Sequence, residues 1–137
     1  MKRNVILDTG PLVALIDGKD RHHAWTLRQW ADIEPPLLTC ESVISEACFL
    51  LGRIRVGSST VLEMLSRKVI RLSFRLGDNA TQVGALLQKY SNVPMSVADA
   101  CLVRMSEQEP DSEILTLDSD FRIYRRHSRQ VIPLIAP

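Results

Sequence analysis

The chain has 137 residues, 45% of them hydrophobic and 24% charged, which is the composition of a globular domain and excludes a disordered or fibrous protein. We expect one domain over residues 1–137, and the formal net charge of +1 excludes a bulk charge that would attract nucleic acid or membrane. No apolar run approaches the roughly 20 residues that cross a bilayer, and the first apolar segment ends at Asp8, so we expect a cytoplasmic protein.

Short apolar segments of strand length alternate along the chain with segments of helical periodicity. We expect strands at residues 4–7, 37–39, 69–72, 113–117 and 130–134. We expect helices at residues 11–16, 22–32, 42–52 and 79–90, and two more opened by Thr60-x-x-Glu63 and Ser96-x-x-Asp99, which have capping-box spacing. Because parallel strands need crossover connections, this alternation predicts an α/β fold with a mostly parallel sheet covered on both faces.

Three aspartates follow predicted strands. Asp8 comes directly after the first strand, Asp118 comes directly after the fourth, and Asp120 lies two residues further on. Open α/β sheets bind ligands outside the carboxyl ends of their strands. If the two strands are neighbours, these acids converge at one edge of the sheet.

Two further acids, Glu46 and Asp99, occur in apolar helical segments with few basic residues nearby in the sequence. Burying an unpaired carboxylate is costly unless a cation or hydrogen bonds compensate the charge. A shared divalent cation would compensate all the acids together. Ligand sets made only of oxygen favour Mg²⁺ or Mn²⁺ over zinc.

Each acid also has a purely structural interpretation. Asp8 can cap the following helix, and Asp99 fits the capping box that begins at Ser96. Asp118 and Asp120 can form a turn, and Glu46 can be a charge at the edge of a helix. The functional interpretation is favoured by the combination of these acids, two after different strands and two in apolar helices.

Four segments, in chain order, resemble the acidic motifs of PIN-domain nucleases, a family that includes the VapC-type toxins of prokaryotic toxin–antitoxin pairs. They are VILDTGPL at residues 5–12, SVISE at 42–46, SVADA at 96–100 and ILTLDSDF at 114–121. The resemblance implies a three-layer α/β/α fold with a five-stranded parallel sheet. It also implies a ribonuclease that depends on Mg²⁺ or Mn²⁺ and acts on RNA, and, for the toxins of the family, an antitoxin partner.

The resemblance assigns roles to residues by position. The family's catalytic and metal-binding acidic quartet corresponds to Asp8, Glu46, Asp99 and Asp118. Asp120 corresponds to an additional acid that helps to bind metal, and Thr9 and Thr116 correspond to hydroxyl positions that flank the quartet.

Basic residues dominate the rest of the chain. Without the five candidate acids, seventeen basic residues stand against eleven acids, a net charge of +6. Arg122, Arg125 and Arg126 follow directly after the last acids, and we expect them to contact RNA because such clusters bind the phosphate backbone. A second basic run at residues 67–75 is expected to be a solvated helix face.

The predicted helices at residues 22–32 and 42–66 carry large apolar side chains, namely Trp25, Trp30, Phe49 and Leu51. This is more apolar surface than one small sheet covers, so we expect a homodimer, as the family resemblance also implies. The alternative occupant of the same surface is an antitoxin.

Three other functions are compatible with an acid after the first strand. A phosphotransferase with Asp8 as nucleophile typically has a D-x-D pair, whereas the second position here is Gly10. A phosphoreceiver domain needs a lysine after a late strand, and the last lysine is Lys89. The third alternative is a catalytically silent PIN-like module that binds RNA or a partner, against which the presence of all four acids argues.

Overall fold

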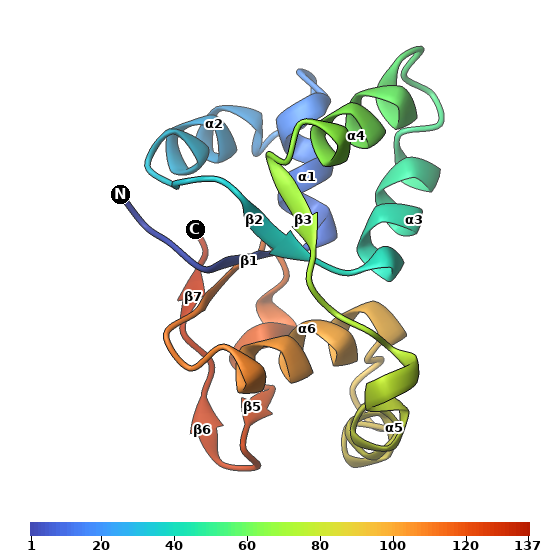
Figure 1. Ribbon diagram of the computed structural model, residues 1–137, viewed down its shortest axis with the longest axis vertical. Helices are drawn as coiled ribbons and strands as arrows, with labels where there is room; N and C mark the ends of the chain where they lie inside the picture. Colours follow the sequence, from blue (N-terminus) through green and yellow to red (C-terminus); the bar gives the residue numbers. More distant parts are fainter.

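A five-stranded parallel sheet lies at the centre of the protein, which a computed structural model describes over residues 1–137 (Figure 1). In spatial order its strands are β3 (Ile70–Leu72), β2 (Leu37–Thr39), β1 (Val5–Leu7), β4 (Glu113–Leu115) and β7 (Leu134–Ile135). β1 pairs in parallel with both β2 and β4. Its three residues are completely buried, as expected for a central parallel strand covered on both faces. The predicted α/β fold with a five-stranded parallel sheet is confirmed.

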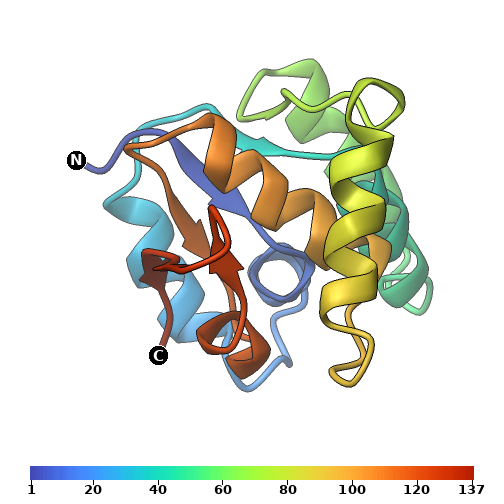
Figure 2. The same ribbon diagram turned by 90° about the horizontal axis from the view of Figure 1, so that it is seen from below.

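Helices cover both faces of the sheet. One side holds α1 (Thr9–Ile16), α2 (His23–Ala31), α3 (Glu41–Leu50) and α4 (Gly57–Ser66), as Figure 1 shows. On the other side, α6 (Val97–Gln108) lies across β1 and β4, and α5 (Ala80–Lys89) packs beside it (Figure 2). α6 is buried on most of its surface because its residues 98–103 are nearly all apolar. None of the helices combines the length and apolar character needed to span a bilayer.

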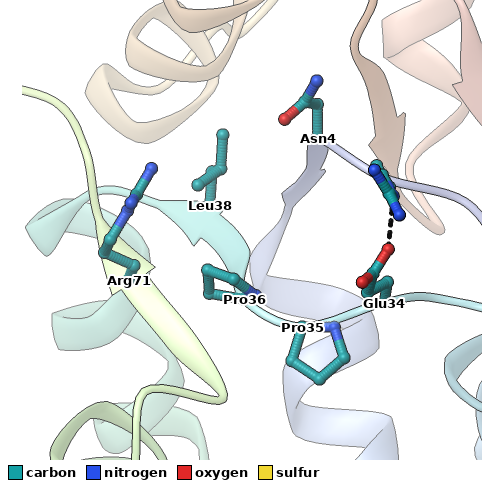
Figure 3. A pocket seen from close by; sticks show the side chains of 7 residues that line it. Asn4, Glu34, Pro35, Pro36, Leu38 and Arg71 are labelled. Carbon is teal, nitrogen blue, oxygen red and sulfur yellow. Dashed lines mark hydrogen bonds and ion pairs between the residues drawn. The ribbon is translucent and has the colours of Figure 1, made fainter.

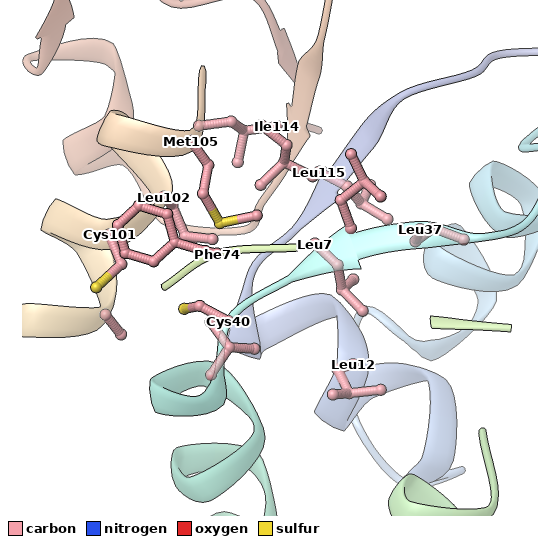
Figure 4. Close-up of a cluster of buried hydrophobic side chains, with 14 of the residues drawn as sticks. Leu7, Leu12, Leu37, Cys40, Phe74, Cys101, Leu102, Met105, Ile114 and Leu115 are labelled. Atoms are coloured by element: carbon pink, nitrogen blue, oxygen red, sulfur yellow. The ribbon is translucent and has the colours of Figure 1, made fainter. Parts of the chain in front are cut away.

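The hydrophobic core lies on both faces of the sheet and fixes the elements that carry the candidate acids. Leu7 of β1 packs toward Leu12 of α1, whereas Met105 and Leu102 of α6 lie by Ile114 of β4 (Figure 4). All of these side chains are at most 2% exposed. Deleting a buried side chain of this size costs about 2–5 kcal/mol, so the core holds β1, β4 and α6 in fixed relative positions.

The predicted strand at residues 130–134 is wrong, because the chain divides there into two strands. Gln130–Val131 form β6, which pairs antiparallel with β5 (Arg125–Arg126), and only β7 joins the main sheet. His127 and Ser128, at φ 49° and 67°, make the tight turn between β5 and β6. Pro133 separates β6 from β7, since it has no N–H to continue a ladder; its carbonyl accepts the N–H of Ile114 instead (2.9 Å).

The predicted capping box at Thr60-x-x-Glu63 is also wrong. α4 begins three residues earlier, at Gly57, and the Thr60 hydroxyl donates to the carbonyl of Val56 inside the first turn (2.7 Å). The early start depends on Gly57, where a Cβ would lie 2.7 Å from the Cβ of Leu51. The turns between α3 and α4 bring Gly57 into contact with Leu51. The spacing of Thr60 and Glu63 cannot predict this contact.

Candidate active site

Asp8 lies where β1 ends and α1 begins, next to the end of β4. Its carboxylate Oδ1 accepts the N–H of Thr9 (2.7 Å) and therefore caps α1. Oδ2 accepts the hydroxyl of Thr116 (2.6 Å). The pKa of Asp8 is raised to about 7, mainly because the carboxyl group is buried; the hydrogen bonds from Thr116 and Thr9 oppose this rise, and the charges of Asp99 and Asp118 add to it. Asp8 is therefore a helix cap and also a buried carboxylate at the carboxyl edge of the sheet.

Thr116 connects Asp8 to Asp118. It follows β4 and is completely buried, and its hydroxyl oxygen also accepts the N–H of Asp118 (2.9 Å). Asp118 in turn caps the short 3-10 helix η2 (Ser119–Arg122), since its Oδ1 accepts the N–H of Asp120 (2.9 Å). The turn interpretation of these two aspartates is thus correct, and the turn places Asp118 next to Asp8.

Asp99 lies in the first turn of α6. The predicted capping box is confirmed: the N–H of Asp99 donates to the Ser96 hydroxyl (3.0 Å), and the N–H of Ser96 donates to Asp99 Oδ2 (3.5 Å). The same Oδ2 accepts the hydroxyl of Tyr124 (3.0 Å). Burial raises the pKa of Asp99, the hydrogen bonds from Tyr124 and Ser96 lower it, and the charge of Asp118 raises it.

Glu46 reaches the same region from the middle of α3 and is more exposed than Asp8. Its side chain makes neither a hydrogen bond nor an ion pair. Partial burial raises its pKa, and so do the charges of Asp99 and Asp118. Glu46 is therefore an unpaired carboxylate that lines the same cavity as both aspartates.

One cavity joins these side chains. It has a volume of about 270 Å³ and lies outside the carboxyl ends of β1 and β4. Its lining residues are Asp8, Thr9, Gly10, Glu46, Leu50, Asp99, Leu117 and Asp118. All four acids of the predicted quartet are among them, whereas Asp120 lies outside the lining, in η2.

Comparison with known proteins gives the family. Residues 5–126 match the sequence model of the PIN domain. The chain belongs to the PIN domain family. In structure the PIN domain is similar to VapC20 of Mycobacterium tuberculosis, which is described as a toxin that cleaves the Sarcin-Ricin loop. The TM-score is 0.75 and the sequence identity is 22%, and the match covers 95% of this chain and 100% of that one. No curated protein sequence matches the chain.

The acids of the PIN domain have no basic counter-charge. None of its ion pairs involves a carboxylate of the quartet, and Arg104, the basic residue nearest Asp99 in the sequence, pairs with Glu107 instead (3.3 Å). The buried Thr9 hydroxyl in the cavity wall also has no hydrogen-bond partner. Unpaired carboxylate oxygens are the donors that Mg²⁺ and Mn²⁺ prefer, so the donor chemistry fits a divalent cation. No three acidic, histidine or cysteine side chains are gathered closely enough to form a ready-made metal site.

The guanidinium groups of the three arginines expected to contact RNA donate hydrogen bonds to backbone carbonyls of the PIN domain. Arg122 donates to the carbonyl of Pro137 (3.4 Å), and Arg125 donates to the carbonyls of residues 122–124. Arg126 donates to Ser106 (3.1 Å) and Pro110 (3.2 Å) at the end of α6 opposite Asp99. None of the three lines the cavity.

The second basic run is not the continuous helix face that its charge pattern suggests. Arg67 caps the end of α4 and pairs with Glu63 (3.2 Å), whereas Arg71 lies on β3. The chain leaves the helix at Lys68, whose φ of 60° is incompatible with a continuing α-helix. The run therefore divides between a helix end, a strand and the loop that follows it.

A second cavity, of about 320 Å³, lies at the opposite edge of the sheet. Figure 3 shows Asn4, Pro36 and Arg71 around it. Arg3 also lines the cavity and pairs with Glu34. Asn4 precedes β1 and Pro36 precedes β2, so this cavity lies at the amino ends of the strands. Open α/β sheets bind their ligands at the other edge, where the four acids are.

Tyr124 is the residue of this site that the sequence does not reveal. It lies 25 residues after Asp99 and belongs to no motif. The arginines that follow it in the sequence suggest RNA contact and not a role for the tyrosine. The preceding segment resembles a family motif that ends at Phe121. Only the fold of η2, which returns the chain to the start of α6, brings the Tyr124 hydroxyl to Asp99.

Proposed function

We propose that this protein is a single-domain, metal-dependent endoribonuclease that hydrolyses RNA phosphodiester bonds with Mg²⁺ or Mn²⁺. The observation that carries the proposal is that four carboxylates from separate segments line one cavity without a basic counter-charge. Burial, and to a smaller extent mutual repulsion, raise the pKa of Asp8, Glu46 and Asp99, so the cluster would gain stability from a bound cation.

The side chains differ in what they can offer a cation. Asp99 Oδ1, Asp118 Oδ2 and both oxygens of Glu46 accept no hydrogen bond. Asp8 has one hydrogen bond on each oxygen, which fixes its orientation and leaves a lone pair on each. We assign these four residues as the metal ligands, with Asp120 supporting a second ion from η2.

The chain's own groups then orient the chemistry. Thr116 holds Asp8 and the backbone of Asp118 at a fixed separation, and Thr9 offers the cavity a buried hydroxyl that has no partner. A divalent cation held by these residues would supply charge neutralisation at the phosphate and would lower the pKa of a water molecule. The cavity holds no serine, cysteine or histidine nucleophile, so direct hydrolysis fits the site.

The substrate assignment rests on the family and on charge. VapC20, whose fold this chain shares, is described as cleaving the Sarcin-Ricin loop, which supports RNA as the substrate and a toxin role with an antitoxin partner. The chain outside the candidate acids is strongly basic, with seventeen basic and eleven acidic residues. We assign the exposed faces of Arg122 and Arg125 to the RNA backbone beyond the cavity.

Purified protein should cleave a mixture of RNAs in the presence of Mg²⁺ or Mn²⁺ and stop when EDTA is added. Gel analysis of end-labelled RNA measures this directly. Incorporation of labelled phosphate at Asp8 without RNA cleavage would instead indicate a phosphotransferase or phosphoreceiver domain. RNA binding without cleavage at any metal concentration would indicate a silent module.

We also propose a homodimer, and in the structure fewer of the apolar side chains that favour it are exposed than the sequence suggests. Leu51 is in the core, and Trp25 and Trp30 are half-buried, so they contribute less exposed surface than the sequence suggests. Phe49 remains 73% exposed on α3, and Leu62 is 51% exposed on α4. We expect a light-scattering mass near twice 15.4 kDa, and Phe49→Ser should lower it toward the monomer. A wild-type monomer at micromolar concentration would leave this surface to an antitoxin.

A further inference from the structure

Tyr124 is a buried tyrosine whose hydroxyl contacts only one acidic side chain. The residue is completely buried, and its ring packs edge-on against Phe121 and Tyr90, with 5.1 Å between ring centroids in both pairs. Its hydroxyl lies 3.0 Å from Oδ2 of Asp99. Because an ionised carboxylate can only accept, the phenol is the donor.

This hydrogen bond decides which oxygen of Asp99 is free. Oδ2 accepts from Tyr124 and, at 3.5 Å, from the N–H of Ser96, whereas Oδ1 accepts nothing. Asp99 lines the cavity and Tyr124 does not. The oxygen bound to the buried phenol is therefore withdrawn from the cavity, and Oδ1 is the atom left to face it. Without Tyr124, only the long bond from Ser96 would orient the carboxylate.

The position of Tyr124 is tied to the segment that carries Asp118. The N–H of Tyr124 donates to the carbonyl of Asp120 (3.2 Å), and Asp118 caps the same short helix. One segment thus supplies an acid to the cavity and a hydroxyl to the acid on α6. The phenol consequently sets the orientation of Asp99 relative to Asp118.

We propose that Tyr124 is a positioning residue that fixes the Asp99 carboxylate with Oδ1 presented to a divalent cation. This inference rests on the proposed metal-dependent function. Outer-sphere partners of metal ligands hold the ligand in its binding orientation, and their loss costs about 10- to 100-fold in metal affinity. Tyr124 acts through Asp99 and touches neither cation nor substrate.

Tyr124→Phe tests the proposal, because it removes one oxygen and keeps the packed ring. Mn²⁺ affinity, measured by electron paramagnetic resonance on the full chain without RNA, should fall about 10- to 100-fold. Tyr90→Phe is the matched control: it removes the neighbouring phenol oxygen, which accepts the N–H of Arg125 (2.8 Å) and contacts no carboxylate. Its Mn²⁺ affinity should equal that of the wild type, even if its melting temperature falls as much.

A double-mutant cycle with Asp99→Asn isolates the path of the effect. Once Asp99 is changed, adding Tyr124→Phe should not weaken Mn²⁺ binding further. Equal Mn²⁺ affinity in wild type and Tyr124→Phe would overturn the inference while leaving the proposed function intact. Absence of Mn²⁺ binding by the wild type would overturn both.

A second measurement needs no variant. In the wild type, the Tyr124 hydroxyl proton should exchange slowly with water in nuclear magnetic resonance spectra, before and after Mg²⁺ is added, because the bond to Oδ2 persists while Oδ1 binds the ion. Rapid exchange in the Mg²⁺-loaded protein would contradict the proposal, even if Tyr124→Phe failed to fold.

Discussion

Asp8→Asn should reduce RNA cleavage at least about 10²- to 10⁴-fold, the usual cost of losing a catalytic group. A neutral amide is a poor metal ligand, and Asp8 is the acid most tightly fixed in the cavity, between Thr9 and Thr116. The amide oxygen can still cap α1, so the fold should be retained. Single-turnover cleavage in Mg²⁺ or Mn²⁺, with circular dichroism on the same samples, measures both effects.

Asp32→Asn is the matched control for this experiment. Asp32 is exposed at the end of α2. Its backbone carbonyl accepts the N–H of Lys2 near the amino edge of the sheet, away from the cavity. Its substitution should leave the cleavage rate unchanged. Wild-type cleavage by Asp8→Asn would remove Asp8 from the active site and, with it, the quartet on which the proposed function depends.

The metal-free protein should lose stability as the pH rises from about 4 to 7. Asp8 has a pKa of about 7 in the folded protein against 3.8 for the unfolded group, so the folded state binds more protons between these values. The free energy of unfolding therefore falls through this window and levels off above it, by about 4 kcal/mol at most. The raised pKa values of Asp99 and Glu46 act in the same direction.

Thermal melting in EDTA from pH 4.5 to 8 measures this slope, and Asp8→Asn identifies its source. The variant has no carboxyl group to ionise at this position, so most of the fall should disappear. It should consequently be more stable than the wild type at pH 7.5. Parallel stability curves for the two proteins would show that Asp8 ionises in the folded protein as easily as in the unfolded one.

The sequence predicts most of the fold because its signals are local. The central strands are short apolar runs between turn residues, and the capping box at Ser96 marks the start of α6 within a single turn. The strand at residues 130–134 fails because the choice between two partners is not local: residues 130–131 pair with β5, and only β7 reaches β4. The start of α4 fails for a similar reason, since it depends on contact between Gly57 and Leu51.

The candidate site shows the same division. The quartet can be found from the sequence because each acid follows a strand or opens or edges an apolar helix, and the structure places all four around one cavity. The structural interpretations of Asp8 and Asp99 as caps, and of Asp118 as a turn residue, are also correct, so a local structural role and a place in the site are not alternatives here. The roles of Arg126 and Tyr124 are inaccessible to sequence reasoning, because each depends on a distant partner, 20 residues away for Arg126 and 25 for Tyr124.

The pairing of β1 with β4 has a consequence for synthesis of the chain. Asp8 is made early, but its partner Thr116 and the nearby Asp118 follow more than a hundred residues later. A nascent chain that stops before β4 has three of the four acids, but it lacks the strand that pairs with β1 and the residues after it that line the cavity. The cavity therefore cannot form until residues 113–118 have been made and have paired with β1, so a shorter nascent chain exposes no complete site.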